Sequence, residues 1–171
     1  MARQSPGFNP ALETMITKII SGGQTGADRG GLDVAIRHGI PHGGWCPKGR
    51  KAEDGVIPDN YLLEETSSAV LQRIGRNVRD SDGTVVFTLA STTGGLRRTI
   101  DLAASFGKPW LHLAKSGTDD PAVMLQHFVT ANSIQCLNVA GTQESEEPGI
   151  YLWVSGVIET AFWSPGNAGL P

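Results

Sequence analysis

Two glycine turns, each placed between an apolar run and a stretch with helical spacing, constrain this fold most strongly. The first turn, residues 21–28, follows a β-branched run at 15–20 and precedes apolar residues spaced as on a helix. The second, residues 91–95, follows the apolar run 84–89 and precedes a helical stretch that stops at Gly107. This repeat predicts a Rossmann-like, doubly wound α/β domain with a mostly parallel sheet of five or six strands and helices on both faces.

The first turn has the composition of an anion-binding loop. Glycine permits a tight bend and a close approach of backbone N–H groups, and the following helix adds the positive end of its dipole. A phosphate is the expected occupant, and the alternative is a plain turn without a ligand. Neither a P-loop nor G-x-G-x-x-G is present, which argues against a standard kinase or NAD enzyme. The candidate binding residues are Gly22, Gly23, Gln24, Thr25, Gly26, Ala27 and Asp28.

The second turn is expected to face the same crevice, because the carboxyl ends of parallel strands lie at one edge of a sheet. Its candidate binding residues are Thr93, Gly94 and Gly95.

A third candidate segment is the long loop that begins at residue 43. Lys48 and Arg50 are expected to clamp an anion held at the first turn, and Trp45 to stack on a planar ring. The competing interpretation is a solvated charge run beside a half-buried tryptophan.

Other chemistry-bearing residues have simpler interpretations. Cys46 lies beside cations that lower a thiol pKa, but a lone cysteine next to proline is more often a small buried residue. Asp80 and Asp82 suggest an acid/base or metal pair, but residues 81–83 are better explained as turn chemistry. The histidines show no metal-ligand spacing, so no metal site is expected.

Composition narrows the class of protein. The length of 171 residues suits one domain, expected at 15–163 between a flexible leader at 1–14 and a flexible tail at 164–171. The net charge of −3 offers no basic surface to nucleic acid, and no apolar run approaches the ~20 residues that span a membrane. Cys46 and Cys136 lie far apart, so we expect a cytoplasmic protein with free thiols.

Five segments together resemble the molybdenum carrier family, also called molybdenum cofactor carrier proteins. They are residues 22–29 (GGQTGADR), 43–50 (GGWCPKGR), 77–84 (NVRDSDGT), 93–95 (TGG) and 137–141 (LNVAG). The resemblance spans roughly residues 15–163. It implies a Rossmann-like domain similar to the lonely guy phosphoribohydrolases, a homo-oligomer (dimer or tetramer) and molybdoenzymes as partners. It also implies binding of the molybdenum cofactor, a pterin with a dithiolene and a terminal phosphate.

The chain departs from these relatives at two places. Thr142 and Gln143 stand where the family usually has Pro-Arg, and the phosphoribohydrolase Gly-Thr pair is absent, with Asp101 in place of a glutamate. We therefore expect a protein that binds and carries a small phosphorylated ligand without turnover. The alternatives are a nucleotide-processing enzyme of phosphoribohydrolase type that uses Asp101, Asp28 or Asp80, and a nucleotide-sensing adaptor domain.

Overall fold

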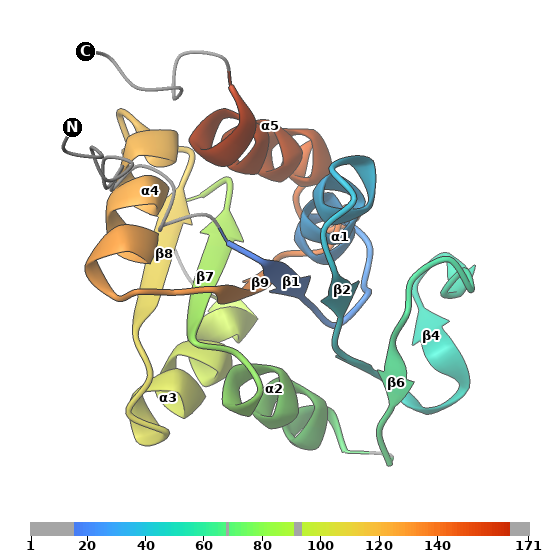
Figure 1. Cartoon of the computed structure of the whole chain (residues 1–171). Helices are drawn as coiled ribbons and strands as arrows, with labels where there is room; N and C mark the ends of the chain where they lie inside the picture. Colours follow the sequence, from blue (N-terminus) through green and yellow to red (C-terminus); the bar gives the residue numbers. More distant parts are fainter. Residues whose placement is uncertain (1–15, 68, 91–93, 165–171) are drawn as a thin grey trace, which may run out of the picture.

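The computed structural model describes residues 16–67, 69–90 and 94–164, and its centre is a parallel five-stranded sheet (Figure 1). Every neighbouring pair of strands in this sheet is parallel. The strand order is β2 (His42–Gly43), β1 (Lys18–Ile20), β9 (Cys136–Gly141), β7 (Gly83–Thr88) and β8 (Trp110–Ala114). The predicted fold class is confirmed, with five strands in the main sheet.

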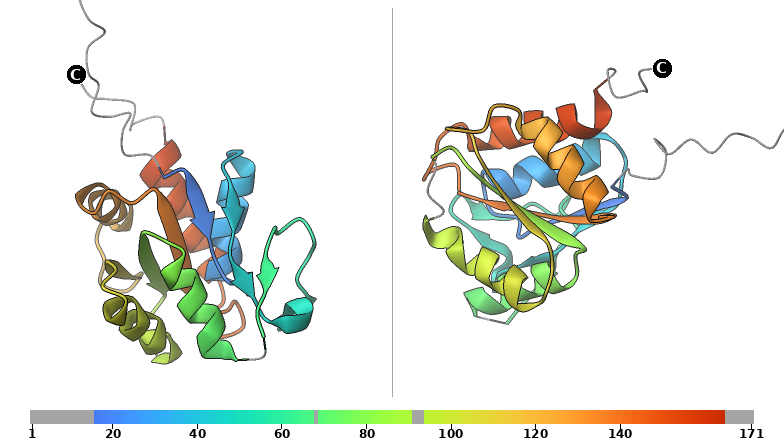
Figure 2. Two further views of the ribbon diagram at one scale, coloured as in Figure 1. Left: turned by 60° about the horizontal axis from the view of Figure 1, so that its bottom comes forward. Right: turned by 90° about the vertical axis from the view of Figure 1, so that its left-hand side faces the viewer.

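Helices cover both faces of the sheet, as Figure 2 shows from two sides. One face carries α1 (Ala27–Arg37), α4 (Pro121–Ala131) and α5 (Ile150–Trp163), and the other carries α2 (Val70–Arg79) and α3 (Arg97–Ser105). All six residues of β7 are buried, as expected for a parallel strand covered on both faces. The largest buried cluster joins the sheet to the three-helix face through side chains such as Phe87, Leu125 and Ile158.

The last strand in the sequence lies in the middle of the sheet. When the strands are counted from β9, the order along the sheet becomes 3-2-1-4-5, which is that of a doubly wound dinucleotide-binding fold. The first βα unit of the usual arrangement, β9 followed by α5, is therefore at the C-terminal end of this chain. The strand order reverses between β9 and β7, and such a switch point is where open α/β sheets bind ligands.

The long segment after β2 contains short regular elements that the sequence did not predict. Strands β3 (Trp45–Cys46) and β6 (Glu64–Glu65) pair in parallel, and β4 (Lys51–Ala52) and β5 (Gly55–Val56) form a hairpin. Each strand has two residues, which is too short for a periodic pattern to reveal. Two 3₁₀ turns, η2 (Lys48–Arg50) and η3 (Gly94–Leu96), complete the elements.

Helix α2 begins at Val70, and the hydroxyl of Thr66 before it donates to the carbonyl of Cys46 at 3.2 Å. The helix continues through Asn77, whose side chain binds the backbone N–H and carbonyl of Trp45 at 2.8 and 3.0 Å. Helix α4 begins with a side-chain cap, because Asp120 accepts from the N–H of Val123 at 3.2 Å.

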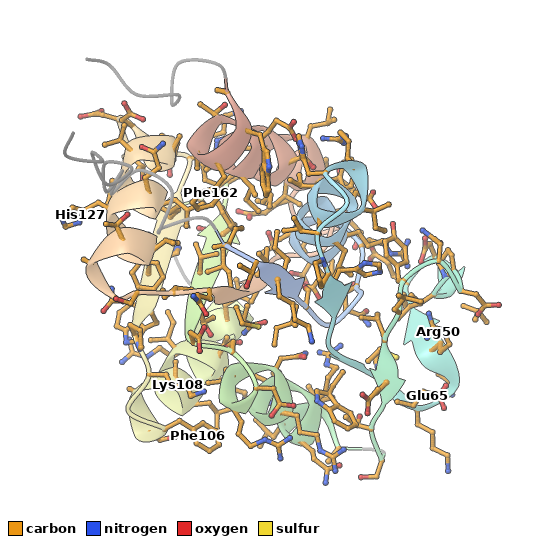
Figure 3. The ribbon with its side chains drawn as sticks, in the orientation of Figure 1. Arg50, Glu65, Phe106, Lys108, His127 and Phe162 are labelled. Carbon is orange, nitrogen blue, oxygen red and sulfur yellow. The ribbon has the colours of Figure 1, made fainter. Side chains whose placement is uncertain are left out.

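Arg50 holds the segment after β2 together. Its guanidinium donates to four backbone carbonyls at 2.8–3.2 Å, those of Ile57, Pro58, Tyr61 and Leu63. Its side chain lies in this segment at the side of the sheet (Figure 3).

We predict that Arg50→Met lowers the free energy of unfolding by about 2–3 kcal/mol, because four carbonyls lose a charged donor. Urea unfolding followed by circular dichroism measures this difference. Lys48→Met removes the same charge from an exposed side chain and should change stability by less than about 0.5 kcal/mol. Equal effects of the two substitutions would contradict the structural role of Arg50.

Candidate functional site

Loops at the carboxyl ends of β1, β9 and β7 meet around one cavity of about 360 Å³. Gly22 and Gln24 line it from the first glycine turn, and Gly94 and Gly95 from the second. The β9–α5 loop adds further lining residues, including Gln143 and Glu147. The structure thus brings the two glycine turns together, as the sequence predicted, and places them at the switch point of the sheet.

The glycines of the first turn permit close backbone packing. A Cβ on Gly26, whose φ is +81°, would lie 2.5 Å from the carbonyl oxygen of Thr142. A Cβ on Gly22 would lie 2.9 Å from Oδ2 of Asp28. The contact at Gly26 packs the turn against the β9–α5 loop, and the contact at Gly22 packs it against the Asp28 side chain, so larger side chains at either position would disturb the turn.

Several backbone N–H groups at these loops already have acceptors within the protein. Gln24 N–H donates to Asp28 at 3.2 Å, and Ala27 N–H donates to the Thr142 carbonyl at 3.2 Å. Leu89 and Ala90 donate their N–H groups to Glu147 at 2.7 and 2.8 Å.

A carboxylate of the chain also caps the N-terminal end of helix α5. The N–H groups of Gly149 and Tyr151 donate to Glu144 at 2.6 and 3.0 Å. Carboxylates of the chain itself therefore occupy amide positions at three βα turns, where an external anion would otherwise bind.

Asp28 is the candidate carboxylate that lines the cavity. It is 9 % exposed, and burial raises its pKa from 3.8 to about 6. The charge of Arg73 and the N–H of Gln24 act in the opposite direction and lower the pKa. A carboxyl with a raised pKa in a cavity is typical of functional sites.

Arg73 on α2 supplies a positive charge to the cavity, although no sequence motif pointed to it. A Cβ on Gly22 would lie 3.7 Å from its Nη1 atom, and within the described residues no hydrogen bond or ion pair engages its guanidinium. The spacing of Val70, Arg73, Ile74 and Asn77 could have identified it, because all four share the helix face that lines the cavity.

The predicted clamp lies elsewhere. Lys48 and Arg50 do not line the cavity, and Arg50 is engaged with the four carbonyls described above. Trp45 Nε1 donates to Asp80 at 2.8 Å, and the guanidinium of Arg76 lies 4.4 Å from the centre of the Trp45 ring system. Arg50 and Trp45 therefore contact the segment between β3 and α2, and Lys48 is exposed.

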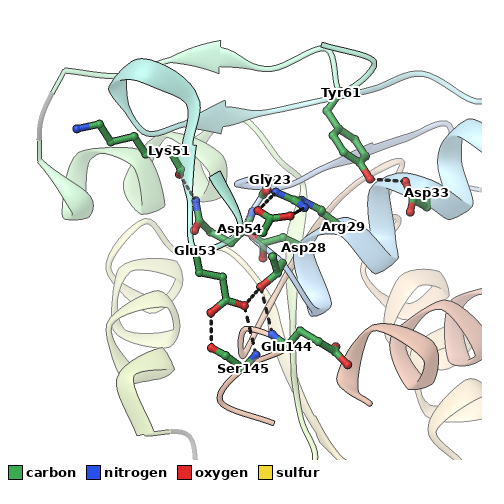
Figure 4. A network of polar contacts seen from close by, with 12 residues as sticks. Gly23, Asp28, Arg29, Asp33, Lys51, Glu53, Asp54, Tyr61, Glu144 and Ser145 are labelled. Carbon is green, nitrogen blue, oxygen red and sulfur yellow. Dashed lines mark hydrogen bonds and ion pairs between the residues drawn. The ribbon is translucent and has the colours of Figure 1, made fainter. Parts of the chain in front are cut away.

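The β4–β5 hairpin fixes the outer side of the first turn (Figure 4). Glu53 accepts hydrogen bonds from the hydroxyls of Thr25 and Ser145, so it joins the turn to the β9–α5 loop. Asp54 forms a bidentate pair with Arg29 at 2.5 and 2.8 Å. Thr25 therefore stabilises the turn from outside the cavity, and of the other predicted residues Gly23, Gly26 and Ala27 also lie outside its lining. Thr93 lies outside the described residues.

The remaining acidic candidates have other partners. Asp101 is exposed and pairs with Arg97 on its own helix at 3.0 Å, and Asp80 pairs with Arg79 at 2.6 Å. Asp82 accepts from the N–H groups of Gln135 and Cys136 at 3.0 and 2.8 Å, so it is tied to the start of β9.

The thiol of Cys46 belongs to the core. It is fully buried, and burial raises its pKa, which favours the interpretation as a small core residue. Among residues 16–67, 69–90 and 94–164, no three His, Cys, Asp or Glu side chains gather as metal ligands. Within the same residues, no helix has the length and apolar character needed to cross a membrane.

Fold and strand order together define a Rossmann-like domain with a permuted strand order and a cavity at its switch point. The model of the circularly permutated YpsA SLOG family matches residues 19–162, and the chain belongs to this family. The family description agrees with the central position of β9.

A crystal structure is also similar to this chain, that of the "Putative molybdenum carrier protein" from Syntrophus aciditrophicus SB. It has a TM-score of 0.82 and 42% sequence identity, and the match covers 85% of this chain and 94% of that chain. The comparison with curated proteins gave no match. The resemblance inferred from the five sequence segments is confirmed.

The raised pKa of Asp28 predicts how stability depends on pH. Below 3.8 the carboxyl is protonated in both the folded and the unfolded state. Between 3.8 and about 6 only the unfolded state ionises, so folded-state stability falls as pH rises, and the loss persists above 6.

We therefore predict that Asp28→Asn stabilises the protein by about 1–2 kcal/mol near pH 8 and has little effect near pH 3.5. Urea unfolding at both pH values measures the difference. Asp101→Asn, which removes an exposed carboxyl, should change stability by less than about 0.5 kcal/mol at either pH. A destabilised Asp28→Asn protein at pH 8 would contradict a raised pKa at this carboxyl.

Proposed function

We propose that this protein binds a small phosphorylated ligand in the cavity between β1, β9 and β7, and carries it without chemical turnover. The leading candidate for the ligand is the molybdenum cofactor. The observation that supports this proposal most directly is Arg73, whose guanidinium lines a cavity at the switch point and makes no hydrogen bond or ion pair with the described residues.

The residues of the cavity suit such a ligand. A guanidinium binds phosphate with up to two parallel hydrogen bonds. A Cβ on Gly94 or Gly95 would meet no atom of the described residues within 4 Å, which leaves space beside the N-terminal end of α3. The volume of about 360 Å³ is within the range of small-molecule sites.

The arrangement favours binding over catalysis. Hydrogen bonds from two N–H groups and the Thr142 hydroxyl hold Glu147 in place. Asp101, at the position of the phosphoribohydrolase glutamate, is exposed and lies outside the cavity lining.

Titration with molybdenum cofactor released from a molybdoenzyme under anaerobic conditions tests this proposal. We expect saturable binding by the wild type and at least about tenfold weaker binding by Arg73→Ala, because the phosphate loses its charged partner. Arg98→Ala removes an equal charge from an exposed position of α3 outside the cavity lining and should bind like the wild type. Absence of saturable binding, or equal affinities of the three proteins, would falsify the carrier proposal.

A second candidate function follows from the raised pKa of Asp28, because a carboxyl that titrates near neutrality can act as a general acid or base. In this alternative the protein hydrolyses the N-glycosidic bond of a nucleotide. Incubation with a panel of nucleoside 5′-monophosphates should then release free base, and Asp28→Asn should abolish the release. We predict no base release by the wild type, since the carrier proposal includes no turnover. Base release that persists in Asp101→Asn and disappears in Asp28→Asn would favour the enzyme.

Self-association and delivery of the ligand to molybdoenzymes complete the proposal. A groove between α4 and α5 is lined by Leu152, Trp153 and Val157, and Leu152 is 74 % exposed. An exposed apolar side chain at a groove of this kind is compatible with a contact between subunits. The alternative of a nucleotide-sensing adaptor domain would place its nucleotide in the same cavity.

A further inference from the structure

The carboxylate of Asp28 lies where the first glycine turn was expected to hold a phosphate. Resting on the proposed function, we propose that Asp28 binds a pair of adjacent hydrogen-bond donors on the same ligand whose anionic group binds Arg73. The cavity then selects ligands that combine an anion with such a donor pair, and a phosphate alone is only half of what it recognises.

Charge determines which end of the ligand faces the first turn. The N–H of Gln24 donates to Oδ2 of Asp28, and the N–H of Gly22 also stabilises this carboxylate. A phosphate at the same amides would face an ionised carboxylate and be repelled. The first turn therefore presents an acceptor to the cavity, and the anion of the ligand belongs on the side of Arg73.

The Asp28 carboxylate can accept more hydrogen bonds than the backbone N–H groups of the first turn supply. An ionised carboxylate offers about four lone-pair positions. The neighbouring Ser21 lies close enough to lower the pKa of Asp28, and its hydroxyl also donates to the Val139 carbonyl at 2.7 Å. Asp28 lines the cavity and retains acceptor capacity beyond the backbone donors that it already has.

Asp28 and Arg73 face the same part of the cavity wall. A single point, the Cβ position of Gly22, lies 2.9 Å from Asp28 Oδ2 and 3.7 Å from Arg73 Nη1. No ion pair within 4.0 Å joins these side chains among the described residues. A ligand that binds both side chains would therefore present its donors and its anion to adjacent parts of one wall.

Two parts of a ligand can supply the donor pair. One is the edge of a 2-amino-4-oxo heterocycle, such as a pterin or guanine, which carries adjacent N–H donors. The other is the vicinal diol of a ribose, and an acidic residue after the second strand binds this diol in dinucleotide-binding folds. Counted from β9, the strand before Asp28 is the second strand.

Isothermal titration calorimetry with three nucleotides tests the inference. The probes are guanosine 5′-monophosphate, inosine 5′-monophosphate, which lacks the 2-amino group, and 2′-deoxyguanosine 5′-monophosphate, which lacks one hydroxyl. We expect the wild type to bind one of the two analogues at least about tenfold more weakly than guanosine 5′-monophosphate. In Asp28→Asn this difference should fall below about threefold. The weaker analogue identifies the source of the donors.

Two controls accompany the titrations. Asp101→Asn should retain the full discrimination, since Asp101 is exposed and outside the cavity lining. Inorganic phosphate should bind Asp28→Asn at least as tightly as the wild type, which shows that the variant keeps a folded cavity.

Three outcomes overturn the inference: no saturable binding of guanosine 5′-monophosphate, equal binding of the three probes, or undiminished discrimination in Asp28→Asn. These outcomes are separable from failure of the proposed function. A protein that binds molybdenum cofactor but fails here remains a carrier without a donor-pair site. A protein that does not bind molybdenum cofactor but discriminates among the three nucleotides has another ligand and keeps the donor-pair site at Asp28.

Discussion

The close approach of α1 to the central strand β9 is the constraint on which the rest of the site depends. A Cβ on Gly141 would lie 2.4 Å from the Cβ of Ala27, and one on Gly31 would lie 2.9 Å from the Cβ of Val139. Only glycine fits such distances, so these contacts set how near the first helix comes to the central strand. The lining of the cavity by both glycine turns follows from this packing.

Carboxylates of the chain itself accept hydrogen bonds from backbone N–H groups at the βα turns. Asp28, Glu144 and Glu147 each accept hydrogen bonds from loop amides that would otherwise be exposed to the cavity or to solvent. Such bonds fix the loops in one geometry, because a buried unpaired amide is costly. Their negative charges also mean that the cavity is not a simple anion site, and Arg73 is the cationic side chain that lines it among the described residues.

Much of the fold could be predicted from the sequence because its signals are local. Strand β7 is a continuous apolar run, and Asp120 with Pro121 marks the start of α4. The position of β9 between β1 and β7 could not be predicted in this way, since it depends on pairing between distant segments. The short strands at residues 45–65 have two residues each and are held by pairing with one another and by side-chain bonds such as those of Arg50 and Asn77.

The candidate site could likewise be predicted only where local sequence signals determine which residues take part. The predicted residues Gly22, Gln24, Asp28, Gly94 and Gly95 line the cavity, because they lie between β1 or β7 and the first turn of the following helix, where the strand ends converge. Lys48 and Arg50 were assigned by charge alone, and charge does not tell where a long side chain points. Arg73 was missed because its role depends on which face of α2 turns toward the sheet, which is a property of tertiary packing.

The central position of β9 also has a consequence for synthesis of the chain. Both neighbours of β9 are made first, and neither β1 nor β7 has its shared partner until residues 136–141 have left the ribosome. Until then each strand presents an open edge, which invites pairing with other chains. A nascent protein of this family therefore completes its sheet late, and chaperones that cover strand edges would act on it longest during this interval.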